Sequence, residues 1–302
     1  MKKIAVLMGG ISSEREVSIT SGRNIAEALS TLGKYEVLPV ILDSESLDAM
    51  PKDVDAAYIA LHGGWGENGG AQEALDRLAI PYTGPGAAAS KLAMDKVATK
   101  VVCRKCGIPT AEWTTVGAGI PAPFKYPFVV KIPCDGSSVG VYLVHNEAAY
   151  LEAIKKCREL GCAEPMAEEY IAGREMTVGI IDSHALPAIE IVAKGGWYGY
   201  DEKYNSEETR YPFLADSGNS ADIELEARLK KTALAAYNAC GCRGVTRVDF
   251  RVSDDGKEYV LELNTSPGFT SHSLVPKSGM REGRTFAEVC DMILGSATYD
   301  KQ

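Results

Sequence analysis

A hairpin near the C-terminal end constrains the fold of this 302-residue chain more than any other feature. Asp255-Gly256 is a strong signal for a two-residue turn between two antiparallel strands. The apolar pairs that face each other in this register are Val248 with Leu263, Phe250 with Leu261, and Val252 with Tyr259. The sequence therefore predicts an antiparallel hairpin with one apolar face.

The opposite face of this hairpin is polar. Asp249 faces Glu262 in the same register, and Arg247 faces Asn264. Two carboxylates that face each other directly repel. Neutralisation by Arg247 and Arg251, protonation of one carboxyl group, or a divalent cation between the two would each relieve the repulsion. Such oxygen ligands suit Mg²⁺ or Mn²⁺ better than zinc. From the local pattern, a metal site and a solvated face with salt bridges are equally good interpretations.

The N-terminal part of the chain alternates between strand and helix patterns. Residues 4–8 form a continuous apolar run, which is typical of a parallel strand covered on both faces. A helix over 17–32 and strands over 35–42 and 56–61 follow. This order predicts a small doubly wound domain. Ser12 and Glu14 interrupt the glycine pattern that a dinucleotide site requires, so we discount NAD binding.

The rest of the chain predicts a mixture of helices and strands, which places the protein in the α/β class. Helices are expected over 71–79, 87–106, 148–160 and 223–240, and strands over 124–133, 140–144, 166–171, 176–182 and 185–193. A polar loop is expected over 194–216.

The chain has no G-x-x-x-x-G-K-[ST] motif, so it is not a P-loop enzyme. Lys131 stands instead at the end of a buried strand, before the small-residue loop Gly136-Ser137-Ser138. A loop of this kind can direct backbone N–H groups at phosphates, which makes Lys131 and Lys96 candidate phosphate contacts. Each lysine taken alone is more typical of a surface cation.

Charge and cysteine usage exclude several classes of function. The formal net charge of −9 argues against a broad nucleic-acid or membrane surface, and no apolar run approaches the ~20 residues of a membrane span. We expect no export signal and eight free cytosolic thiols. Cys103-x-x-Cys106 has no second metal-binding pair at zinc-finger spacing.

Six short motifs along the chain belong together. They are Gly9-Gly10-x-Ser12-x-Glu14-Arg15-Glu16-Val17-Ser18, Leu61-His62-Gly63-x-x-Gly66-Glu67-x-Gly69, Gly136-Ser137-Ser138-Val139-Gly140, Lys203-Tyr204, Arg247-x-Asp249, and Glu262-x-Asn264-Thr265-x-Pro267-Gly268-x-Thr270-x-His272-Ser273. From about residue 4 to residue 292, this set closely resembles the D-alanine–D-alanine ligases of the ATP-grasp superfamily. The resemblance favours a metal at Asp249 and Glu262 over a solvated face.

The resemblance implies an α/β chain with the ATP-grasp fold. We expect an N-terminal Rossmann-like parallel-sheet domain over 1–92, then two α+β ATP-grasp subdomains over 93–176 and 177–302 that sandwich ATP. The implied reaction uses ATP and two Mg²⁺ (or Mn²⁺) ions to join two D-alanines through a D-alanyl phosphate, which yields a peptidoglycan precursor. The implied enzyme is cytoplasmic and homodimeric, and it binds small molecules but no nucleic acid or membrane.

The resemblance also implies a role for individual residues. Lys96, Lys131 and Lys203 should contact phosphates, and Glu168, Tyr170, Ile171 and Glu175 should surround the adenine and ribose. Asp249, Glu262 and Asn264 should bind the metal ions. Arg247 and the Gly268 N–H should stabilise the oxyanion. Glu14 should accept the first substrate's ammonium group near His62, Ser273 and Leu274 should bind the second substrate's carboxylate, and Ser137 and Tyr204 should form a network with Glu14.

Other interpretations stay open. Another ATP-grasp carboxylate–amine ligase would keep the metal hairpin but lack the Glu14 and Ser273 motifs. An inactive nucleotide-binding module should lack some of the lysines and carboxylates, yet all of them are present. A D-alanine–D-lactate or D-serine ligase would differ in the loop that contains Lys203-Tyr204. Because Lys203-Tyr204 is the pattern of the dipeptide-forming group, we expect D-alanine as the second substrate.

Overall fold

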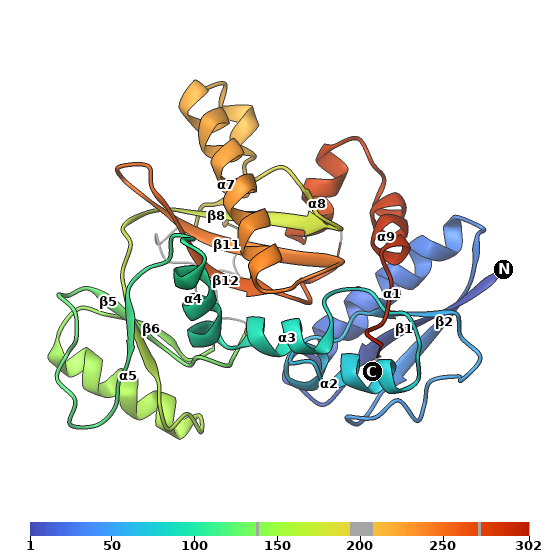
Figure 1. Ribbon diagram of the computed structural model, residues 1–302, viewed down its shortest axis with the longest axis horizontal. Coiled ribbons are helices and arrows are strands. Elements are labelled where there is room, and N and C mark those ends of the chain that lie inside the picture. The colour runs from blue at the N-terminus through green and yellow to red at the C-terminus, as the bar shows by residue number, and fades with distance from the viewer. Residues whose placement is uncertain (137–138, 194–207, 271–272, 302) are drawn as a thin grey trace.

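The computed structural model describes residues 1–136, 139–193, 208–270 and 273–301. Its elements form three separate sheets in chain order (Figure 1). The first sheet is parallel, with strand order β2-β1-β3, and consists of β1 (Lys2–Gly9), β2 (Tyr35–Leu42) and β3 (Ala56–Ile59). Helix α1 (Arg15–Thr31) crosses from β1 to β2. The apolar run of β1 is buried, as the sequence predicts.

The second sheet is antiparallel and lies at the far end of the molecule from the first (Figure 1). Its strand order is β4-β7-β5-β6, from β4 (Trp113–Thr115), β5 (Phe128–Lys131), β6 (Val141–Val144) and β7 (Met166–Glu169). Helix α5 (Glu147–Glu159) packs on it through Tyr150 and Ile154, which contribute to one apolar core with Phe128. The short edge strand β4 was not predicted.

The third sheet lies between the other two and contains the predicted hairpin (Figure 1). Its order is β10-β8-β11-β12, with β9 beside β8. The strands are β8 (Gly173–Ile181), β9 (His184–Ala185), β10 (Ile189–Ile191), β11 (Val245–Ser253) and β12 (Glu258–Asn264). Helix α7 (Ser220–Ala239) covers the apolar face, and the 3-10 helix η2 (Leu214–Ser217) precedes it.

The predicted hairpin register is correct on one side of Asp249 and wrong on the other. Asp249 pairs with Glu262 and Arg247 with Asn264, which confirms the polar face. Beyond Asp249, a bulge shifts the pairing by one residue, so the expected pairs of Phe250 with Leu261 and Val252 with Tyr259 are wrong. The turn has three residues rather than two, because the Ser253 N–H bonds the Lys257 carbonyl at 2.9 Å, with Gly256 at φ +81°.

The helix expected over 87–106 is two helices, α3 (Ala87–Met94) and α4 (Lys96–Lys105). Asp95 breaks it with an extended backbone, and its carboxylate caps α4 by accepting bonds from the N–H groups of Val97 at 2.9 Å and Ala98 at 3.0 Å. The break places Lys96 at the first position of α4.

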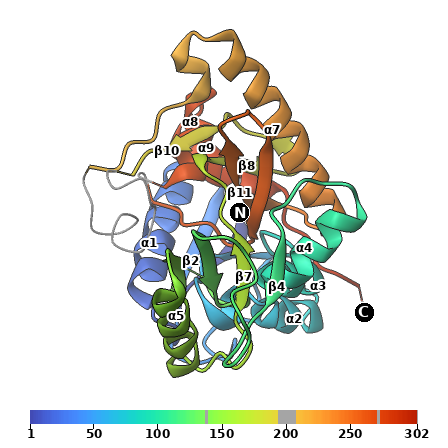
Figure 2. The ribbon, with the colours of Figure 1, turned by 90° about the vertical axis from the view of Figure 1, so that its left-hand side faces the viewer.

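The C-terminal segment returns to the first sheet. Helices α8 (Leu274–Arg281) and α9 (Phe286–Gly295) were not predicted, and α9 packs beside α1 in one apolar core (Figures 1 and 2). Thr298 then bridges to Tyr82. Helix α2 (Gly70–Arg77) and the 3-10 helix η1 (Gly64–Gly66) complete this region.

The three sheets follow the predicted domain order, although β8 crosses residue 176, so the division into 1–92, 93–176 and 177–302 stays a prediction. Within the described ranges, no helix combines the length and the apolar character needed to cross a bilayer.

Candidate active site

A cavity of about 510 Å³ lies where the sheets meet, and most of the predicted site residues line it. They are Glu14, His62, Lys96, Glu175, Arg247, Asp249, Glu262, Asn264, Gly268, Ser273 and Leu274. A smaller cavity of about 110 Å³ shares Lys96, Glu175 and Glu262 with it and is also lined by Lys131, Glu168, Tyr170 and Ile171. Ser137, Lys203 and Tyr204 lie outside the described residues.

Three carboxylates, Glu175, Asp249 and Glu262, line one side of the cavity, and we call them the carboxylate face. Asp249 and Glu262 are direct cross-strand neighbours on β11 and β12. The alternation of a strand directs Glu175 of β8 to the same side, while Met176 enters the core. The bulge in the hairpin turns Leu261 toward this cavity rather than into the core.

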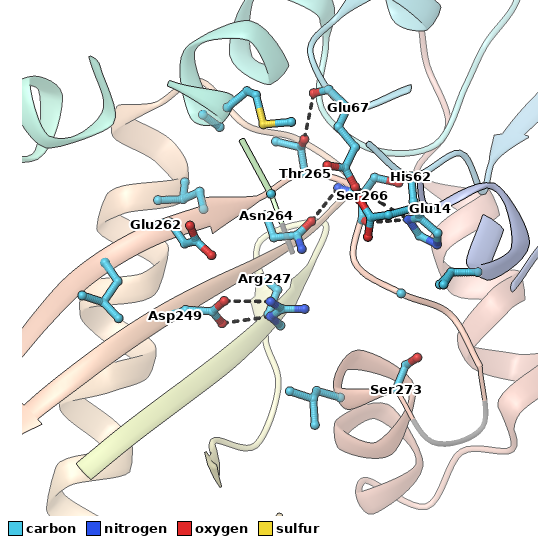
Figure 3. A pocket seen from close by; sticks show the side chains of 18 of the residues that line it. Glu14, His62, Glu67, Arg247, Asp249, Glu262, Asn264, Thr265, Ser266 and Ser273 are labelled. Carbon is cyan, nitrogen blue, oxygen red and sulfur yellow. Dashed lines mark hydrogen bonds and ion pairs between the residues drawn. The ribbon is translucent and has the colours of Figure 1, made fainter. Parts of the chain in front are cut away.

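Each of these carboxylates has a cationic neighbour. Arg247 binds Asp249 through two parallel bonds, Nε to Oδ1 at 2.9 Å and Nη2 to Oδ2 at 2.7 Å (Figure 3). Thr177 also donates to Asp249 Oδ1, at 2.6 Å. Lys96 Nζ lies 3.1 Å from Glu262 Oε2. Arg247 and Lys96 therefore neutralise the two facing carboxylates, whereas Arg251, which the sequence suggested for this role, pairs with Glu175.

Glu175 is the least neutralised of the three. Burial, together with the negative charges of Asp249 and Glu262, raises its pKa to about 7 against the pull of Arg251. Arg251 Nη1 is 3.4 Å from Glu175 Oε2, and its other donors bind the backbone carbonyls of Ile171 at 3.0 Å and Gly173 at 2.8 Å. Arg251 therefore fixes the chain between β7 and β8, where Tyr170 and Ile171 line the smaller cavity.

A second set of charged side chains is buried at the wall of the smaller cavity. Glu168 of β7 forms ion pairs with Lys131 of β5 and with Lys100 of α4, and we call these three residues the cationic cluster. Their exposed fractions are 2% for Glu168, 6% for Lys131 and 1% for Lys100. Burial raises the pKa of Glu168, but the two lysines outweigh it and hold that pKa below its usual value. Sequence reasoning gave Lys100 no role. Its only signal was its place one helical turn after Lys96.

Lys96 joins the hairpin to the loop after β5. Its Nζ donates to the carbonyl oxygen of Asp135 at 2.5 Å while it contacts Glu262. The predicted phosphate-binding loop begins at the next residue, Gly136, which lines both cavities. The break in the helix at Asp95 is what directs Lys96 to this position.

The N-terminal sheet contributes Glu14 and His62. Glu14 precedes α1, and His62 follows β3, so both stand at the carboxyl edge of the parallel strands. His62 is buried, with one ring nitrogen 3.0 Å from the Ser266 carbonyl oxygen and the other 3.2 Å from Ser21 Oγ. Glu67, which was quoted only within a motif, lies 3.7 Å from the same ring (Figure 3).

Ser273 and Leu274 mark the start of α8. Ser273 Oγ accepts a bond from the Thr270 N–H at 3.0 Å, which links Thr270 to the start of the helix. A side chain at Gly268 would bring its Cβ to 3.3 Å from Ser273 Oγ, so a glycine keeps this approach open. In Figure 3, Ser273 lies across the cavity from Glu262 and Asn264.

The donor set fits a magnesium-type ion. Asp249, Glu262 and Asn264 offer oxygen ligands on one side of one cavity. In the described part of the chain, no group of three His, Cys, Asp or Glu side chains has the arrangement of a metal site. An ion here would therefore use the Asn264 amide and displace Arg247 or Lys96 from its carboxylate.

All eight cysteines are free thiols, as the sequence predicts.

Two family models match the chain. The model described as D-ala D-ala ligase N-terminus matches residues 3–50, and the one described as D-ala D-ala ligase C-terminus matches residues 102–295. Curated relatives named D-alanine–D-alanine ligase include one from Syntrophotalea carbinolica, 42% identical over 99% of this chain and 97% of its own. Another, from Methylacidiphilum infernorum, is 39% identical over 97% and 94%.

Solved structures agree with these matches. A D-alanine–D-alanine ligase from Bacillus anthracis, complexed with ATP, is 34% identical, with a TM-score of 0.85 over 98% of this chain and 97% of that one. The D-Ala:D-Ser ligase VanG from Enterococcus faecalis is 27% identical, with a TM-score of 0.83 over 97% and 98%. The expected ATP-grasp fold is therefore confirmed, and the chain belongs to the D-alanine–D-alanine ligase family.

Proposed function

We propose that this chain joins two molecules of D-alanine at the expense of ATP, releasing D-alanyl-D-alanine, ADP and phosphate. One observation carries the proposal. A single cavity of about 510 Å³ gathers Glu14 from the parallel-sheet region, Lys96 from α4, the carboxylate face and the start of α8. Phosphoryl transfer depends mainly on positioning and charge neutralisation, so such a set needs no covalent nucleophile.

The nucleotide would occupy the smaller cavity and its opening into the larger one. Lys131 and Lys96 would contact the phosphates, as would Lys203 from the segment outside the described residues. Glu168, Tyr170, Ile171 and Glu175 surround the space proposed for adenine and ribose. Two magnesium or manganese ions held by Asp249, Glu262 and Asn264 would neutralise the charge that develops on the phosphates.

The two amino acids would bind in the larger cavity. The carboxylate of the first D-alanine attacks the γ-phosphorus of ATP, giving an acylphosphate and ADP. The amine of the second then attacks the acyl carbon, and the tetrahedral intermediate releases phosphate. Arg247 and the Gly268 N–H would stabilise its oxyanion.

Substrate recognition follows the placement of the remaining residues. Glu14 accepts the first ammonium group beside His62, while Ser273 and Leu274 hold the second carboxylate. Ser137 and Tyr204, which lie outside the described residues, would complete a network with Glu14. We also place this chain in the cytoplasm as a homodimer, on the strength of the family resemblance, and light scattering of the purified protein tests the dimer.

A competition assay tests the reaction and its acceptor together. Purified protein receives ATP, magnesium and D-alanine with an equal amount of D-serine or D-lactate at pH 6, 7 and 8.5. We measure ADP release and identify products by mass spectrometry. The proposal predicts D-alanyl-D-alanine as the main product, favoured at mildly alkaline pH because the attacking amine must lose a proton. Absence of ADP release with D-alanine would refute the ligase activity, and a D-serine product or a depsipeptide at pH 7 would refute the acceptor.

A further inference from the structure

The charge balance of the cationic cluster gives Lys100 a part in nucleotide binding. Glu168 is almost fully buried and contacts two lysines, one at each carboxylate oxygen. If Glu168 had Lys131 alone as its partner, the pair would be neutral, and Lys131 would have little net charge to offer a phosphate. With both lysines charged, the cluster has one positive charge in excess.

Only one of the two lysines reaches the nucleotide cavity. Lys131 lines the smaller cavity, whereas Lys100 does not. Lys100 Nζ is fixed from behind by the hydroxyl of Thr110 at 2.6 Å and the carbonyl oxygen of Ala111 at 3.1 Å. Its ammonium group also lies 5.5 Å from the centre of the Trp113 ring. These contacts hold Lys100 on the side of Glu168 that faces away from the cavity.

We propose that Lys100 is a positioning residue that neutralises Glu168, so that the charge of Lys131 stays available to the phosphates of a bound nucleotide. The inference rests on the proposed function only in naming ATP as the ligand. The physical reason is the low dielectric of the buried cluster, in which each added or removed charge has a large effect. Lys100 thus acts on the nucleotide through Glu168 and Lys131 without touching it.

Calorimetric titration with magnesium-ATP, without D-alanine, tests this role independently of catalysis. Lys100→Met keeps the length of the side chain and removes its charge. We expect its Kd for ATP to rise about tenfold, with the KM for D-alanine within about twofold of the wild-type value. The matched control is Arg104→Gln, one turn further along α4. Arg104 also stacks on Trp113, and its guanidinium carbon lies 4.0 Å from the ring centre. Unlike Lys100, it pairs with an exposed carboxylate, that of Glu112. The control variant should bind ATP as the wild type does.

A double variant separates charge balance from simple loss of structure. Lys100→Met combined with Glu168→Gln removes both charges, which restores the excess charge on Lys131 and avoids an uncompensated buried carboxylate. Because Glu168 also lines the cavity proposed for adenine, the reference is Glu168→Gln alone, and we expect the addition of Lys100→Met to that variant to change its Kd for ATP by less than about threefold. Unchanged ATP binding in a folded Lys100→Met protein would overturn the inference. So would a folded double variant that binds ATP tenfold more weakly than Glu168→Gln, and this comparison still applies if Lys100→Met alone does not fold. Wild-type protein that binds ATP but releases no ADP with D-alanine would refute the proposed function and leave this inference standing.

Discussion

The cationic cluster and the carboxylate face lie side by side in the site but are built on opposite principles. In the cluster, one carboxylate holds two lysines, and all three groups are buried. On the face, each carboxylate has a cation of its own, and the Glu262 side chain is 36% exposed. The cluster is a fixed positive charge that cannot easily exchange partners. The face is a set of pairs whose cations can be replaced.

This difference predicts which ligand each region takes. A buried excess of positive charge attracts a polyphosphate whether or not a metal is present. Oxygen ligands paired one to one with Arg247 and Lys96 accept a divalent ion only when something else receives the displaced cations. The phosphates of a bound nucleotide are suited to that purpose. We therefore expect nucleotide and metal to bind the carboxylate face together.

Loss of a carboxylate from the face should have the largest effect. Asp249→Asn or Glu262→Gln removes a negative ligand, and we expect turnover to fall by at least about 10²-fold. Steady-state rates over a range of magnesium concentrations measure this. Asp255→Asn, at the exposed turn of the same hairpin, is the matched control. Near-wild-type activity of either site variant at low magnesium would show that these carboxylates hold no metal.

Removal of the cluster lysine that lines the smaller cavity should have the next largest effect. Lys131→Ala deletes the charge that lines the smaller cavity, and we expect the KM for ATP to rise about tenfold or more, with a smaller change for D-alanine. Lys105→Ala, on the exposed end of α4, serves as the control. An equal rise in both KM values would place Lys131 outside the nucleotide site.

The sequence predicted the polar face of the hairpin partly because two errors cancelled. The turn at Gly256 has one residue more than expected, and the bulge after Asp249 takes up one residue on the partner strand. Asp249 therefore faces Glu262 as predicted, while the apolar pairs near the turn do not form. A bulge of this kind has no clear local pattern, because Leu261 is apolar whether it enters the core or lines the cavity.

Residues that act through long-range contacts could not be predicted. In the sequence, nothing distinguishes Lys100 from the other lysines of its predicted helix. Its contact with Glu168 on β7 depends on the fold. Thr177, which donates to Asp249, depends in the same way on the pairing of β8 with β11. Lys96 was predicted, but the break at Asp95 that directs it to the site was not. The sequence pattern over 87–106 is helical throughout and gives no sign of that break.

The carboxylate face should also make stability depend on pH. In metal-free buffer Glu175 has a pKa of about 7 when folded, against a usual 4.5. The folded protein thus holds a proton that the unfolded chain has lost, so the free energy of unfolding falls as pH rises through this range. Glu175→Gln stays neutral and should nearly match the wild type at pH 4.5, but be more stable by on the order of 3 kcal/mol at pH 8. Urea unfolding with Glu112→Gln as the exposed control measures this, and a constant difference at all pH values would contradict it.

Magnesium alone should have the smallest effect, and it tests the comparison most directly. Without a nucleotide, an ion must compete with the two existing pairs, Arg247 with Asp249 and Lys96 with Glu262. We expect magnesium without ATP to raise the Tm by at most about 1 °C, and ATP without magnesium to raise it more, because the cationic cluster is already formed. Magnesium and ATP together should exceed the sum of the two shifts. A large shift with magnesium alone, lost in Asp249→Asn, would show that the carboxylate face is a preformed metal site whose cations leave without help from the nucleotide.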